Sequence, residues 1–178
     1  MYLGIRKGDI IVCALPNLYQ SLVIFKAANS IGAIVTFINQ RSTSHQISKY
    51  VDLYKSKILF VFNKSSDYVK EINNCSIKYI VNISEKKVDS RIYNKNLCDI
   101  NSSRFIDFHS LPSLGGLWKS RAFDRFRHFN AKDDALILYT SGSTGEPKNI
   151  LFTNENIISS LVYLKASTHT KPYQKNNF

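Results

Sequence analysis

The chain contains the sequence Tyr139-Thr-Ser-Gly-Ser-Thr-Gly-Glu-Pro-Lys148, in which an apolar run passes into small hydroxyl residues, two glycines and one lysine. The run Leu136-Ile-Leu-Tyr139 is typical of a buried strand. The glycines let the backbone approach a ligand closely, while the amide N–H groups and hydroxyls can donate to phosphate oxygens. A lysine adds a mobile positive charge. The sequence therefore predicts a loop that binds a polyphosphate through Thr140, Ser141, Gly142, Ser143, Thr144, Gly145 and Lys148.

This loop departs from the Walker A pattern, which requires glycine immediately before Lys-Ser/Thr. Pro147 stands before Lys148 and has no N–H to offer a phosphate, and Asn149 follows the lysine. The sequence from Asn149 to Phe152 predicts another strand rather than a helix opening on the ligand. A P-loop NTPase is thus disfavoured. A flexible Gly/Ser linker is also disfavoured, because apolar strands flank the loop on both sides.

Strands and helices alternate along most of the chain, before and after this loop. Apolar runs predict strands over residues 9–15, 33–38, 58–62, 77–83, 135–139 and 150–152. Helical spacing predicts helices over 18–32, 47–54, 67–72 and 154–164. Asn17 is expected to cap the first helix, and residues 43–46 form a capping box before the second. Residues 84–104 are polar and predict a surface excursion. The alternation predicts an α/β fold with a mostly parallel sheet and helices on both faces. Ligands of such sheets bind outside the carboxyl ends of strands, where the loop falls.

Composition limits the alternatives. A length of 178 residues fits one compact domain. The net charge of +11, from 24 basic and 13 acidic residues, is compatible with a basic module that binds nucleic acid or an anionic membrane. The lysines are scattered, however, which favours compositional bias over a binding face. Residues 118–129 predict a basic amphipathic helix whose aromatic stripe packs on the sheet, rather than one that lies on lipid.

The cysteines and histidines form no recognisable site. Cys13, Cys75 and Cys98 are an odd number without a C-x-x-C pair, which indicates unpaired thiols in a reducing cytoplasm. Cys13 stands in an apolar run and is expected in the core. The four histidines have no metal-ligand spacing. No stretch is typical of a secretory signal or a membrane span.

The loop sequence resembles the phosphate-loop signature of the adenylate-forming enzymes, which include acyl-CoA synthetases, firefly-type luciferases and the adenylation domains of peptide synthetases. Residues 16–33 resemble the family's early strand, helix and turn, although Ser30 stands where the family has lysine. Residues 37–47 resemble a segment common in acyl-CoA synthetases and favour a CoA ligase over a peptide-synthetase domain. The family usually has glycine at Asn149 and often histidine at Asn154. The resemblance covers about residues 8–164.

The resemblance implies an incomplete amino-terminal portion of the adenylate-forming fold. It implies a partial AMP-binding domain over 1–164, followed by a disordered tail over 165–178. The implied reaction is ATP-dependent activation of a carboxylic acid, of the fatty-acid type, through an acyl-adenylate that CoA captures. Lys148 is the implied catalytic residue, Thr140 to Gly145 with Lys148 the implied phosphate ligands, and Thr144 the implied Mg²⁺ ligand.

Other functions remain open from the sequence alone. The chain could be a catalytically silent fragment, a peptide-synthetase-type adenylation domain, or the basic module described above. As a fragment it is expected to be inactive by itself, and the carboxy-terminal part of the family fold is an expected partner if it exists as a separate chain. Its other expected partners are ATP and a carboxylic acid whose identity the sequence does not specify.

Overall fold

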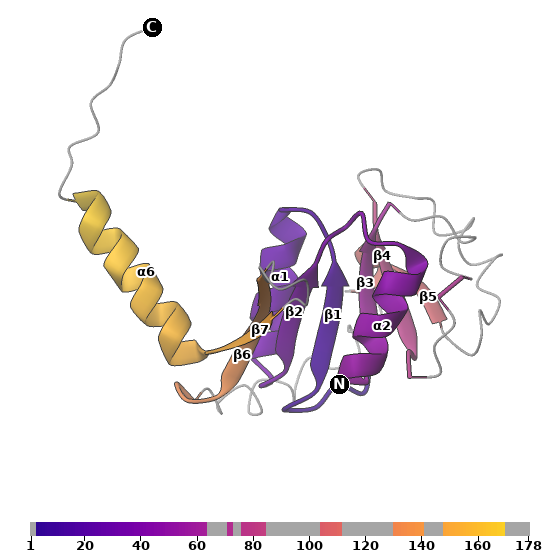
Figure 1. Cartoon of the computed structure of the whole chain (residues 1–178), viewed down its shortest axis with the longest axis horizontal. Helices are drawn as coiled ribbons and strands as arrows, with labels where there is room; N and C mark the ends of the chain where they lie inside the picture. The colour runs from indigo at the N-terminus through magenta and orange to yellow at the C-terminus, as the bar shows by residue number, and fades with distance from the viewer. Residues whose placement is uncertain are drawn as a thin grey trace, which may run out of the picture.

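The computed structural model describes residues 3–63, 71–72, 76–84, 104–111, 130–140 and 148–169. Within these ranges the strands form one seven-stranded sheet in the order β5-β4-β3-β1-β2-β6-β7 (Figure 1). The strands are β1 (Ile10–Ala14), β2 (Ile34–Ile38), β3 (Ile58–Phe62), β4 (Tyr79–Ile83), β5 (Arg104–Asp107), β6 (Asp134–Thr140) and β7 (Lys148–Thr153). All neighbours are parallel except β6 and β7, which are antiparallel. The predicted α/β fold with a mostly parallel sheet is confirmed.

Helices α1 (Tyr19–Asn29) and α2 (Ser44–Tyr54) cover opposite faces of the sheet (Figure 1). Successive strand residues alternate between the two faces, so each face has its own core. The α1 side contains Cys13, Ile24, Ala28, Val35 and Phe60, and the α2 side contains Val12, Ile47, Val51, Leu59 and Val61. The central strands are therefore apolar on both faces, as a parallel sheet covered by helices requires. Cys13 is a fully buried free thiol, as expected, and burial raises its pKa.

The capping box predicted for α2 is confirmed. The Thr43 hydroxyl accepts a hydrogen bond from the Gln46 N–H at 3.3 Å, and the Gln46 side chain accepts one from the Thr43 N–H at 3.0 Å. Both bonds satisfy donors that a helix start would otherwise leave open. The cap predicted for α1 is wrong. Leu18, not Asn17, is its N-cap residue and makes no side-chain capping bond, because the helix begins one residue later than the Pro-Asn pair suggested.

Most elements lie within a few residues of the expected ranges, but one strand was missed and one helix is longer than expected. Strand β5 and the short helix η1 (Phe108–Ser110) were not predicted, because only Phe105 and Ile106 form the apolar signal of a four-residue strand. Helix α6 (Asn154–His169) extends five residues past the expected end at 164, since no glycine or proline interrupts it before Pro172. The helices predicted over 67–72 and 118–129 fall wholly or mainly outside the described residues.

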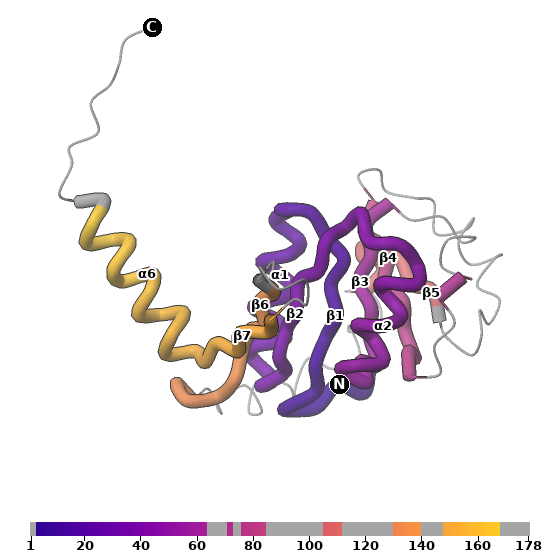
Figure 2. Tube along the Cα trace, in the orientation of Figure 1, coloured from indigo at the N-terminus to yellow at the C-terminus, as the bar shows by residue number. Residues whose placement is uncertain are grey.

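Helix α6 follows β7 and leans away from the sheet (Figures 1 and 2). Several of its apolar side chains are exposed, namely Ile158, Leu161, Val162, Tyr163 and Leu164. Its length and composition, like those of the other helices in the described part of the chain, fall short of what crossing a bilayer requires.

Candidate functional site

The predicted phosphate loop leaves the sheet at the edge where the parallel strands β1 to β6 end, which we call the carboxyl edge. Thr140 is the last residue of β6, and Lys148 is the first residue of β7. These two residues are partners in the antiparallel pairing of β6 with β7. The ends of the loop are thus held side by side at the carboxyl edge. In open α/β sheets this edge is where ligands bind.

The structure places only the two ends of the predicted site. Residues 141–147 lie outside the described residues, so the roles of Ser141, Gly142, Ser143, Thr144 and Gly145 stay predictions. For Thr140 the main chain is described, at the end of its strand. Lys148 is exposed at the start of β7, at the same edge.

Three tyrosines meet near the end of β6 and form a group that we call the tyrosine cluster: Tyr50 and Tyr54 of α2 and Tyr139 of β6. The Tyr139 hydroxyl donates to the Tyr54 hydroxyl at 2.6 Å. The rings of Tyr50 and Tyr139 meet edge to face with centroids 4.7 Å apart, and those of Tyr54 and Tyr139 with centroids 6.4 Å apart. Burial and then the hydrogen bond to Tyr54 raise the pKa of Tyr139, so this hydroxyl stays protonated at neutral pH.

Sequence reasoning missed the tyrosine cluster as part of the site. Tyr50 and Tyr54 were recognised only as members of the apolar stripe of α2, and Tyr139 only as a strand residue. Their spacing of four places both on one helix face. No local signal states that this face meets the end of β6, because that contact depends on the order of strands in the sheet.

Asn154, the position where the resembling family often has histidine, lies at the opposite edge of the sheet. β7 runs antiparallel from Lys148 at the carboxyl edge to Thr153, which pairs with Asp134 at the start of β6. The Asn154 side chain is buried, accepts from the Asn29 amide and donates to the main-chain oxygen of Asn130. It joins α6 to the end of α1 and to the turn before β6. Asn154 therefore lies at the opposite edge from Thr140 and Lys148, where its side chain links three segments of the fold.

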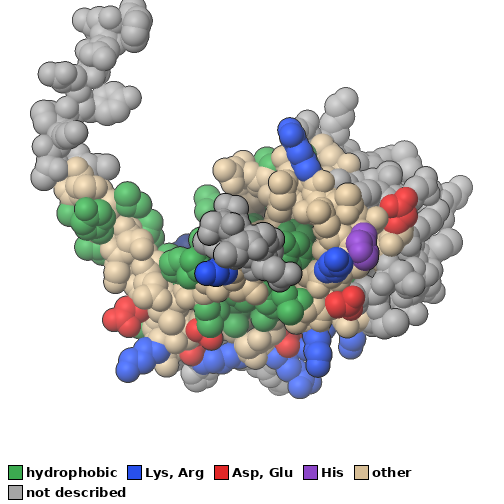
Figure 3. All heavy atoms as spheres, viewed as in Figure 1, with side chains coloured by type: hydrophobic (Ala, Val, Ile, Leu, Met, Phe, Trp, Pro, Cys, Tyr) green, Lys and Arg blue, Asp and Glu red, His purple; other side chains and the backbone are tan. Residues whose placement is uncertain are grey.

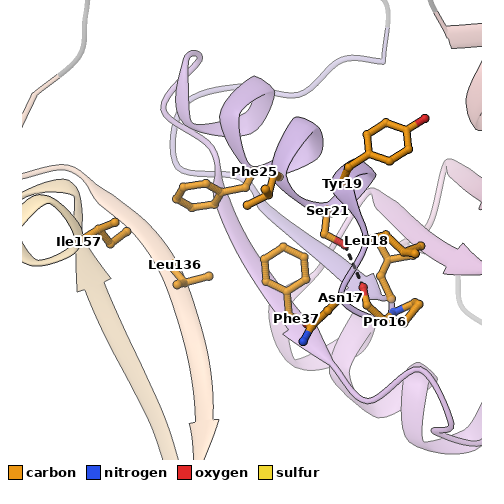
Figure 4. A pocket seen from close by; sticks show the side chains of 11 residues that line it. Pro16, Asn17, Leu18, Tyr19, Ser21, Phe25, Phe37, Leu136 and Ile157 are labelled. Carbon is orange, nitrogen blue, oxygen red and sulfur yellow. Dashed lines mark hydrogen bonds between the residues drawn. The ribbon is translucent and has the colours of Figure 1, made fainter. Parts of the chain in front are cut away.

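An apolar groove of about 670 Å³ lies between α1, β2, β6 and α6 (Figure 4). Phe25 of α1, Phe37 of β2, Leu136 of β6 and Ile157 of α6 line it from four elements. Asn17, which does not cap α1, lines the groove, as does the polar Ser21. The Ser21 hydroxyl donates to the Pro16 carbonyl at 3.1 Å. The groove is thus suited to apolar groups rather than to phosphate.

Basic side chains gather at the edge opposite the loop. Lys7, Lys57, Lys78 and Lys132 each precede one of the parallel strands. Two of them form ion pairs, Lys7 with Asp133 and Lys57 with Asp9. Figure 3 shows acidic side chains among the basic ones along this lower edge. Such mixing of signs disfavours the continuous basic face that a nucleic-acid module needs. Within the described ranges, no cluster of three or more His, Cys, Asp or Glu is placed to hold a metal ion.

A family model and the sequences of curated proteins point to the same family. The family model described as "AMP-binding enzyme" matches residues 1–177. The 4-coumarate–CoA ligase-like 6 of Arabidopsis thaliana is 30% identical over 98% of this chain and 28% of its own length. The 2-succinylbenzoate–CoA ligase of a Geobacillus species is 27% identical over 86% of this chain and 24% of its own length. The chain thus spans roughly a quarter of the length of these curated relatives.

Solved structures agree on the fold. The inhibitor-bound N-terminal domain of FACL13 from Mycobacterium tuberculosis superposes with a TM-score of 0.55 at 25% identity, over 86% of this chain and 33% of that one. The A-PCP didomain of a carboxylic acid reductase from Segniliparus rugosus, in complex with AMP, superposes with a TM-score of 0.70 over 87% of this chain and 23% of that one. Its sequence identity is 13%, so the second likeness concerns the fold alone.

Proposed function

Because the chain belongs to the AMP-binding enzyme family, we propose that it carries the phosphate-binding part of an ATP-dependent ligase that joins a carboxylic acid to CoA. The curated relatives described above are CoA ligases by name. The observation that carries the proposal is the pairing of Thr140 with Lys148 at the carboxyl edge of a parallel sheet. Both ends of the hydroxyl-rich and glycine-rich segment thus lie where such sheets bind their ligands, which supports a ligand-binding role for the segment between them.

The proposed reaction has two steps. A carboxylate oxygen of the acid attacks the α-phosphorus of ATP, the bond to the bridging oxygen of the β-phosphate breaks, and pyrophosphate leaves with that electron pair. The CoA thiolate then attacks the acyl carbon and AMP leaves. Both steps need negative charge neutralised on a leaving phosphate. The present chain would act in the first step.

Residues of this chain would supply that neutralisation around the β- and γ-phosphates. The N–H groups and hydroxyls of residues 140–145 are suited to donate to the phosphate oxygens, and Lys148 follows charge as it moves to the pyrophosphate. Thr144 offers a hydroxyl oxygen of the kind that Mg²⁺ accepts beside phosphate oxygens and water. When bound, Mg²⁺ would screen the charge on the phosphates.

We extend the proposal to a fatty-acid type of substrate. Residues 37–47 resemble a segment common in acyl-CoA synthetases. The apolar lining of the groove beside α1 is compatible with this extension, although the groove lies on the face of the sheet opposite the tyrosine cluster.

The test is titration of the chain with Mg²⁺-pyrophosphate and with ATP·Mg²⁺ by calorimetry. Lys148→Ala is expected to weaken binding by about tenfold or more, because a charge-assisted contact contributes roughly 1.5 to 3 kcal/mol. Lys148→Arg keeps the charge and should retain part of the affinity. Lys132→Ala removes an exposed lysine at the opposite edge and serves as the matched control. Equal affinity of the wild type and Lys148→Ala would contradict the role assigned to Lys148.

A further inference from the structure

The last residues of β6, next to the phosphate loop, have no pairing partners in β2. In the described residues the register joins Val35 to Leu136 and Thr36 to Ile137. By contrast, β1 and β2 are paired at five successive positions. Tyr139 lies two residues beyond the last β2 partner and one residue before Thr140. The last residues of β6 are therefore paired on the β7 side only, and their position relative to β2 depends on side-chain contacts.

The tyrosine cluster provides such contacts. The hydroxyl bond to Tyr54 and the edge-to-face contact with Tyr50 join the Tyr139 side chain to α2 at two points. The three rings pack against the core cluster on the α2 face. Aromatic pairs of this geometry and hydroxyl bonds of this length both favour one arrangement of the rings.

Helix α2 is a firm support for these contacts. Ile47 and Val51 are fully buried in the core beneath it. Its first turn is fixed by the capping box between Thr43 and Gln46. Because Tyr50 and Tyr54 are four residues apart, they project from the same face of this anchored helix.

We propose that Tyr54 is a positioning residue for phosphate binding, which holds Tyr139 through their hydroxyl bond and thereby sets the place of Thr140 and Lys148 at the carboxyl edge. This inference rests on the proposed function of the loop. Displacement of the end of β6 would move Lys148 as well, because Lys148 is the pairing partner of Thr140. Tyr54 would act without touching the ligand, through the position of the two loop ends.

The experiment compares Tyr54→Phe with Tyr50→Phe in the whole chain. Tyr54→Phe removes the hydroxyl that accepts from Tyr139 and keeps the ring, whereas Tyr50→Phe keeps the ring contact and serves as the matched control. Two quantities are measured: amide hydrogen exchange at residues 138–140 and 148–150, and the dissociation constant for Mg²⁺-pyrophosphate. We expect Tyr54→Phe to raise both by about three- to tenfold, the effect of losing one hydrogen bond, and Tyr50→Phe to leave both near the wild-type values. Exchange in β1 and β3 should not change.

Each outcome decides the proposal. Unchanged exchange at the strand ends in Tyr54→Phe would overturn it, as would faster exchange with unchanged pyrophosphate affinity. A parallel change in β1 and β3 would mean that the tyrosines act only on global stability. If the wild type itself does not bind pyrophosphate, the proposed function fails and so does the role in phosphate binding, while the exchange data still show whether the tyrosines fix this segment. In a Tyr139→Phe background, Tyr54→Phe should have little further effect on binding, since the bond between the two hydroxyls is already absent.

Discussion

The sheet from β5 to β2 and the limb formed by β6, β7 and α6 are built differently. Val12, Leu59 and Val61 in the first region have no exposed surface. Leu138 of β6, Leu151 of β7 and Leu161 of α6 are 39%, 51% and 60% exposed. The first region is covered by helices on both faces, whereas α6 of the limb leans away from the sheet (Figure 1). The candidate phosphate loop therefore sits on the less buried of the two regions.

The difference shows that the apolar composition of a strand does not by itself determine how deeply the strand is buried. The sequences of β3 and β6 are similarly apolar, and both predict strands covered on two faces. Only β3 has neighbours on both sides within the parallel sheet and helices above and below it. The limb is joined to the first region by the short pairing of β6 with β2, by the buried Ala135 and Ile137, and by polar contacts of Asn154 and Tyr139.

The largest expected effect contrasts one leucine from each region. Leu59→Ala should lower the free energy of unfolding by about 2 to 5 kcal/mol, because it leaves a cavity in a fully buried site. Leu151→Ala should change it by no more than about 0.5 kcal/mol, since the side chain is half exposed. Urea denaturation followed by circular dichroism measures both. Similar losses for the two variants would show that the limb is as well packed as the centre of the sheet.

An intermediate effect on the free energy of unfolding is expected at Asn154, whose hydrogen bonds connect α6 with Asn29 and Asn130. Asn154→Ala should lower the free energy of unfolding by about 1 to 3 kcal/mol, because the half-buried Asn29 amide and the Asn130 carbonyl lose their partner. The loss should appear mainly as faster amide exchange in α6 and β7. A double-mutant cycle with Asn29→Ala checks the assignment: the two changes should be strongly non-additive, and additive effects would show that the amides do not act as a pair.

The smallest expected effect concerns the ion pair at the base of β1 and β3. Burial alone would raise the pKa of Asp9, but hydrogen bonds from Lys57 and the Arg6 N–H, with the charges of both residues, lower it below its usual value. A lowered pKa means that the stabilisation is present above about pH 4 and is lost as the pH falls through the folded-state pKa. We expect Asp9→Asn to reduce stability at neutral pH by less than about 1 kcal/mol, and this difference to shrink below pH 4.

The control for this pH dependence is Lys57→Met. In that background Asp9→Asn should have a smaller effect on the free energy of unfolding, which is measured by urea titration between pH 3 and pH 7. A difference between wild type and Asp9→Asn that grows towards low pH would reverse the sign and contradict the role of the pair.

The sequence predicted the parts of the fold that depend on local pattern. The runs that form β1 to β4, β6 and β7 were recognised because each is a short apolar segment, and the capping box of α2 because its two partners are three residues apart. Strand β5 was missed, since two buried residues between polar neighbours carry little periodicity. Asn17 was misassigned as a cap because a Pro-Asn pair marks a helix start only to within a residue or two.

For the candidate site, the sequence by itself determined which residues can bind phosphate, because hydroxyls, glycines and a lysine within ten positions have that chemistry wherever the chain folds. Only the tertiary structure decided that Thr140 and Lys148 are paired at the carboxyl edge, that Tyr54 reaches Tyr139 across 85 positions, and that Asn154 lies at the opposite edge. These placements depend on the order and direction of strands. Strand order is fixed by long-range packing, which no local stretch of sequence contains.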